Sequence, residues 1–85
     1  MNIFYETLLR NDIFPDNEEY IDIVMEMYEK DEKQRHYIML VLEDYIHGGS
    51  KFTAYKYLRQ WVILPFKRWA KKSEHLDEEF KEKMR

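Results

Sequence analysis

The chain has 85 residues, which suffices for one domain with a single core and leaves little room for a deep substrate cavity. Its 45% hydrophobic content, with only two glycines and two prolines, is typical of a folded helical protein rather than of a chain that is disordered over most of its length. The absence of cysteine excludes disulfides, zinc–thiolate sites and cysteine nucleophiles.

Charge is divided sharply along the chain. Residues 1–47 hold 12 acidic and four basic side chains, residues 48–72 hold seven cations and no acid, and the net charge is −3. This separation indicates a protein that meets another macromolecule. The N-terminus lacks the basic start of a secretory signal, and the longest apolar runs are far shorter than the ~20 residues that span a bilayer. We therefore expect a cytoplasmic protein with no membrane partner.

Hydrophobic spacing predicts a compact all-α bundle that forms a single domain over residues 1–85. Asn2 is suited to cap the first helix, with Phe4 and Leu8 facing the core. Phe14 precedes a proline and is expected in an extended connector. Asp16 followed three residues later by Glu19 matches a capping box, which predicts Asp16 as the cap of the second helix. The expected helices span about 3–10, 17–30, 33–47 and 50–72, with a short C-terminal helix in 73–85 that frays or becomes ordered only on a partner.

The third and fourth helices form the centre of the expected fold. The third helix has an apolar face that includes Val41, and Tyr37, Met39 and Leu40 widen it beyond what one neighbouring helix covers, so we expect this helix to be the most buried. Gly48 is suited to end it in a left-handed conformation, and Ser50 to cap the fourth. Pro65 lacks an amide donor and collides with the preceding turn, at a cost of about 3 kcal/mol in a straight helix. We therefore expect a kink, or two helices meeting, near Pro65.

The residues predict no catalytic site, no metal site and no cofactor. Ser50, a candidate hydroxyl nucleophile, sits where a helix cap is expected. Glu43 and His47 share a helical face but lack the further ligands of an HExxH-type site, so a solvated pair is the favoured interpretation. No glycine-rich loop is placed to cradle a phosphate. We expect a protein that is not an enzyme.

The stretch GGSKFTAYKYLR, from Gly48 to Arg59, resembles the turn and recognition helix of helix-turn-helix DNA-binding proteins. In this comparison Gly48 makes the turn, and Ala54 and Leu58 pack inward. The resemblance implies DNA contacts from the outward face, continued by the cations that follow. The predicted nucleic-acid-binding residues are Lys51, Thr53, Lys56, Arg59, Lys67, Arg68 and Lys71.

The preceding helix departs from that pattern. Glu43, Asp44 and His47 stand where small and apolar residues are expected, and two carboxylates there repel a duplex. The glycines and the serine are equally explained as the end of one helix and the start of another. The cations are equally explained as a solvated face paired with the acidic helices, in contacts worth only ~0–1 kcal/mol each.

Protein binding is the alternative function. Aromatic residues make up 16% of the chain, and tyrosine and tryptophan are enriched at interface anchors, although most of these side chains are equally explained as core. An antagonist or adaptor can dock on a partner, for example a nucleic-acid-handling protein, through its acidic helices or its aromatic side chains, and the latter can also form a homodimer. The predicted protein-interface residues are Tyr57, Trp61, Phe66, Trp69, Glu18, Asp22, Glu26 and Glu29. We thus predict a small regulator whose partner is DNA or, as the alternative, another protein.

Overall fold

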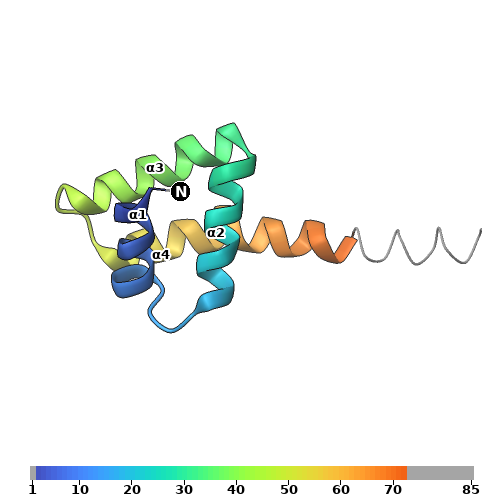
Figure 1. Cartoon of the computed structure of the whole chain (residues 1–85), viewed down its shortest axis with the longest axis horizontal. Coiled ribbons are helices and arrows are strands. Elements are labelled where there is room, and N and C mark those ends of the chain that lie inside the picture. The colour runs from blue at the N-terminus through green and yellow to red at the C-terminus, as the bar shows by residue number, and fades with distance from the viewer. Residues whose placement is uncertain (1, 73–85) are drawn as a thin grey trace, which may run out of the picture.

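The computed structural model describes residues 2–72, and the predicted all-α bundle is confirmed (Figure 1). The predicted C-terminal helix lies in residues 73–85, outside the described part of the chain. Residues 64–72 are also helical, and they run outward beyond the bundle (Figure 1). The other elements are α1 (Ile3–Leu8), the π-helical turn η1 (Leu9–Ile13), α2 (Glu18–Lys30), α3 (Glu32–Ile46), α4 (Lys51–Leu58) and a second π-helical turn, η2 (Arg59–Ile63).

Side-chain caps set where the helices begin. The predicted caps Asn2 and Ser50 are confirmed, since each accepts the backbone N–H two residues ahead, at 2.7 and 3.1 Å. The predicted cap of α2 is wrong. Asn17 accepts the N–H of Tyr20 at 3.1 Å, whereas Asp16 adopts a left-handed φ of +62° in the turn before it. A short polar side chain tolerates that conformation, which frees the next residue to cap the helix.

The two π-helical turns bring apolar residues into the core that α-helical spacing does not place there. In η1, the N–H of Phe14 donates to the carbonyl of Leu9, five residues back, at 2.8 Å. Phe14, expected in an extended connector, is therefore a core residue with 1% exposure, whereas Phe4, expected in the core, is 55% exposed. The core residues are Tyr5, Leu9, Ile13, Phe14, Ile21, Ile23, Val24, Ile38, Val41, Leu42, Ala54, Leu58, Val62 and Ile63.

The helix that begins at Lys51 does not end at Pro65. Leu64, which precedes the proline, keeps α-helical dihedral angles, and Figure 1 shows the ribbon continuing in the same direction through residue 72. The widened turn η2 ends at Ile63, two positions before the proline, and the segment continues as one helix rather than as two helices that meet there. We refer to the whole segment 51–72 as the long helix.

Candidate macromolecule-binding surface

The turn between α3 and α4 depends on both of its glycines. Gly48 has a φ of +107°, a conformation that residues with a side chain rarely adopt. A methyl group at Gly49 would lie 2.8 Å from the carbonyl oxygen of Asp44. Ala54 and Leu58 are buried, in line with their expected inward packing. The turn and α4 therefore have the local form that the sequence predicts.

Two cations of the long helix are held against the start of α2. Lys67 forms an ion pair with the carboxylate of Glu19, and its ammonium lies 5.3 Å from the centre of the Tyr20 ring. The hydrogen bond to Glu19 raises the pKa of Lys67. Arg59 donates to the hydroxyl of Tyr20 at 3.4 Å, a contact that raises the pKa of Arg59. Both side chains thus have partners within the protein.

The remaining cations of the long helix are exposed. Within residues 2–72, none of them forms an ion pair or a hydrogen bond. Lys71 borders a shallow groove of about 400 Å³ that also contains Asp22 and Glu26, so carboxylates of α2 lie near it. The exposed cations are Lys51, Lys56, Arg68, Lys71 and Lys72. The basic block is therefore mostly not neutralised by the acidic helices, a point that the sequence alone leaves open.

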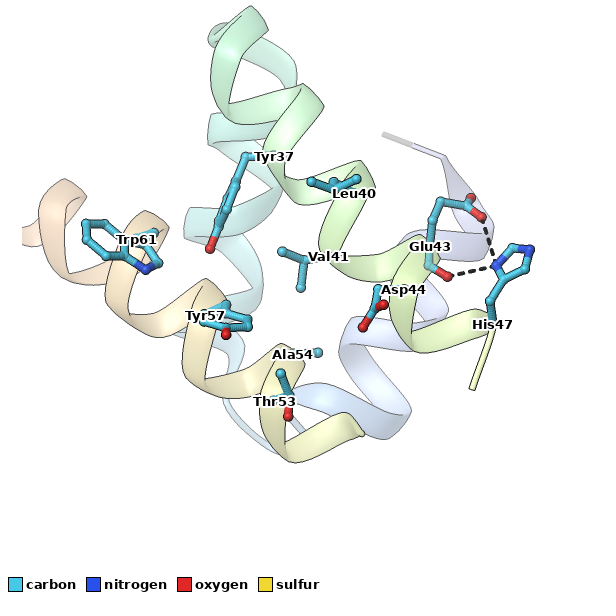
Figure 2. Close-up of a pocket in the computed structure, with 10 residues that line it drawn as sticks. All are labelled: Tyr37, Leu40, Val41, Glu43, Asp44, His47, Thr53, Ala54, Tyr57 and Trp61. Atoms are coloured by element: carbon cyan, nitrogen blue, oxygen red, sulfur yellow. Dashed lines mark hydrogen bonds and ion pairs between the residues drawn. The ribbon is translucent and has the colours of Figure 1, made fainter. Parts of the chain in front are cut away.

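A groove of about 680 Å³ lies between α3 and α4 (Figure 2). Leu40, Tyr57 and Trp61 line it and are 69%, 45% and 54% exposed, so large apolar side chains of the groove face solvent. None of the lysines and arginines in residues 2–72 borders it. Its apolar lining residues are Tyr37, Leu40, Val41, Ala54, Tyr57 and Trp61, and its polar ones are Glu43, Asp44, His47 and Thr53. Thr53, a predicted DNA contact, thus lies in a groove that contains carboxylates.

Glu43, on the groove, is fixed by α1. The hydroxyl of Tyr5 donates to a carboxylate oxygen of Glu43 at 2.5 Å, and this bond, with burial, raises the pKa of Tyr5 to about 12. His47 forms the predicted pair with Glu43, since its Nδ1 lies 3.7 Å from the carboxylate and 2.8 Å from the backbone carbonyl oxygen (Figure 2). The described part of the chain contains no group of three potential metal ligands.

The structure divides the predicted aromatic interface residues into two pairs. Tyr57 and Trp61 line the groove between α3 and α4. Phe66 and Trp69, with ring centres 6.2 Å apart, border a different recess together with Met27 of α2. The four side chains therefore do not form one cluster.

The predicted acidic interface is partly engaged within the protein. Glu18 pairs with Arg10, and Glu26 with Lys30 at 2.7 Å. Glu29 has an interaction of its own, and Asp22 is exposed. The side chains on this face of α2 are thus less available to a partner than the predicted list implies.

Sequence reasoning did not identify the groove, since Val41 was expected on the apolar face of α3 and Tyr37 and Leu40 were expected only to widen that face. The excess of apolar side chains on that helix was the sequence feature that could have indicated the groove.

No family model, curated protein or solved structure matches the chain. No helix in residues 2–72 has the length and apolar character that crossing a bilayer requires.

Proposed function

We propose that the protein is a non-enzymatic regulator that binds DNA through the long helix. The observation that carries this proposal is that five of its seven cations are exposed and have no partner within residues 2–72. They lie on a helical segment of 22 residues, about 33 Å long at 1.5 Å per residue. That length is close to one turn of a DNA duplex, roughly 34 Å. A rod with cations along it is suited to phosphate contacts.

The proposed contacts differ in part from those expected from the helix-turn-helix resemblance. Lys51, Lys56 and Arg68 are exposed and suited to bind phosphates. Thr53 lies in the groove, and Arg59 is bonded to Tyr20, so neither is well placed to read base edges. Binding through phosphates positions a protein on DNA without specifying a sequence. We therefore propose DNA binding with little sequence preference, and with Lys71 and Lys72 as the further contacts.

Charge reversal in α4 tests this proposal. Lys51→Glu combined with Lys56→Glu is expected to abolish retention on duplex DNA at low salt while the helical content by circular dichroism stays unchanged. The matched control, Lys30→Glu combined with Lys33→Glu, makes the same change in net charge at the corner between α2 and α3. Unchanged retention after reversal in α4, or equal loss in the control, would contradict DNA binding through the long helix.

A protein-binding antagonist or adaptor is the second candidate. It is supported by the groove between α3 and α4, where Tyr57 and Trp61 are exposed and which also contains the carboxylate of Asp44. Such a surface suits a partner with apolar side chains and a cation, whether a second copy of this chain or another protein. Tyr57→Ala with Trp61→Ala is expected to abolish complex formation with a partner captured by the wild-type protein. Reversal of Glu18, Asp22 and Glu26 should leave that complex intact, and the opposite result would place the interface on α2.

A further inference from the structure

Trp61 lies between two hollows that carry opposite charge. It borders the groove of about 680 Å³ that contains Glu43 and Asp44. It also borders a second hollow, of about 560 Å³, together with Pro65 and Arg68. The two hollows are therefore adjacent along the long helix. We call the residues that border them the Trp61 surface, which is acidic toward the start of α4 and basic beyond Pro65.

The charged ends lie on opposite sides of Trp61 along the long helix. Asp44 is held beside the start of α4, because its carbonyl oxygen accepts the N–H of Gly49 at 2.9 Å. Thr53, which borders the same groove, is eight residues before Trp61, about 12 Å along the helix axis. Arg68 is seven residues after Trp61, about 10 Å in the other direction. The Trp61 surface thus has an apolar centre between ends of opposite sign.

From this arrangement we infer that the protein forms a homodimer in which two long helices pack antiparallel, with Trp61 at the two-fold axis. A two-fold axis brings the same surface of both copies together, so that the acidic end of each meets the basic end of the other. Arg68 of each copy then faces Asp44 of its partner, with Lys72 one helical turn further along. The aromatic side chains Tyr57 and Trp61 meet at the centre, as is common in protein interfaces.

The charge of the groove favours this occupant. Among residues 2–72 the groove is lined by the carboxylates of Glu43 and Asp44 and by no lysine or arginine, which favours an occupant with a cation about 10 Å from an apolar anchor, as in Trp61 and Arg68. The segment that carries Arg68 projects beyond the bundle, where a second copy can reach it (Figure 1). This inference rests on the second of the two proposed functions. Arg68 and Lys72 take part in both proposals, whereas Lys51 and Lys56 border neither hollow, so reversing the charge of Lys51 and Lys56 tests DNA binding without changing the dimer surface.

Sedimentation equilibrium of the full chain tests the dimer. We expect a mass of twice the 10.7 kDa chain at micromolar concentrations. Asp44→Lys and Arg68→Glu should each give a monomer, because each change places like charges opposite one another in both halves of the dimer. An equal mixture of the two variants should regain the doubled mass, since a mixed dimer pairs opposite charges at positions 44 and 68 in both halves. A variant that had merely misfolded would not be rescued by mixing.

Three results would overturn the inference. One is a wild-type protein that remains monomeric up to several hundred micromolar. The second is a wild-type dimer whose two charge variants stay monomeric when mixed. The third is a dimer that persists after Trp61→Ala, which removes the side chain at the axis.

The control variant is Lys33→Glu, at the opposite end of α3 from Asp44, which should leave the dimer intact. A monomeric wild type that still binds DNA would overturn the dimer alone, whereas a dimer that does not bind DNA would overturn only the first proposed function.

Discussion

The side-chain amide of Gln34, on α3, donates to the backbone carbonyl oxygen of Trp61, 3.4 Å away on the long helix. In an unbroken α-helix that oxygen would accept the N–H of residue 65, which is a proline and has none. Gln34 therefore supplies a donor that Pro65 cannot. One consequence is that α3 and the long helix, the two walls of the groove, are joined at the point where Pro65 interrupts the hydrogen bonds.

Removing this bond is expected to destabilise the fold. Gln34→Ala should lower the free energy of unfolding by about 0.5–1.5 kcal/mol, because the carbonyl of Trp61 loses a donor. Pro65→Ala restores an N–H at residue 65, so in that background the cost of Gln34→Ala should fall by more than half. Chemical denaturation of the four proteins in a double-mutant cycle measures the coupling. Equal costs in both backgrounds would show that Gln34 does not compensate for the proline.

Tyr5 is expected to make stability depend on pH in alkaline solution. Its pKa is about 12 in the fold against 10.0 for an unperturbed tyrosine, because Glu43 accepts its proton in a hydrogen bond. The folded chain thus holds this proton more tightly than the unfolded chain. The resulting stability is fully present below pH 10 and is lost as pH rises toward 12.

Tyr5→Phe should therefore reduce the alkaline loss of stability and cost about 1 kcal/mol at neutral pH. The loss of stability at neutral pH is modest because the carboxylate of Glu43 is partly exposed and is hydrated once the tyrosine hydroxyl is removed. Urea denaturation at neutral pH and above pH 10 measures both effects. Some alkaline loss should remain, since the hydrogen bond to Asp12 raises the pKa of Tyr45 as well. A variant with the full wild-type loss would contradict the role assigned to Tyr5.

Substitution of either glycine in the turn should destabilise the protein, for different reasons. Gly49→Ala forces a methyl group to within 2.8 Å of the Asp44 carbonyl oxygen, so we expect a loss of about 1–3 kcal/mol. Gly48→Ala meets no neighbouring atom but strains a φ of +107°, at a cost of about 1–3 kcal/mol. Gly48→Asn should cost less than Gly48→Ala, because asparagine tolerates positive φ better. Thermal denaturation distinguishes these cases, and equal stability of all three variants and the wild type would contradict this description of the turn.

Releasing Lys67 from its acidic partner should strengthen DNA binding. Glu19→Gln removes the carboxylate that pairs with Lys67 and lowers the negative charge beside the long helix. If Lys67 then neutralises one more phosphate, the slope of log K against log salt should become more negative by about 0.9. Glu32→Gln, an exposed change at the start of α3, is the matched control and should leave the slope unchanged. Identical slopes for all three proteins would show that Lys67 does not reach DNA.

The sequence predicts those features of the fold that depend on neighbouring residues. Asn2 and Ser50 each accept the backbone N–H only two residues ahead, so the local sequence is enough to predict both caps. Gly48 adopts a positive φ because one helix ends there and the next begins shortly after it. Asp16 was misassigned because Asn17, also a good cap, lies one position closer to the helix. Phe14 was misplaced because a π-helical turn shifts the helical periodicity, which α-helical spacing does not anticipate.

Features that depend on how helices pack were less predictable. The pairing of Lys67 with Glu19 joins residues far apart in the sequence, and it exists only because the long helix packs beside α2. The groove likewise depends on the space left between α3 and α4. Leu40 looked like part of a buried arc, but packing left it exposed, because periodicity shows that a face is apolar and not whether it is covered.

DNA binding by the exposed cations of the long helix is tested most directly by titrating the purified protein against random duplex DNA over a series of salt concentrations. If all five neutralise a phosphate, the slope of log K against log salt is about −4.5, and if only three share the face that meets the duplex it is about −2.7. We predict micromolar binding at low salt with a slope between these values. Absence of binding at low salt, or a slope near zero, would contradict the proposal that these side chains bind DNA.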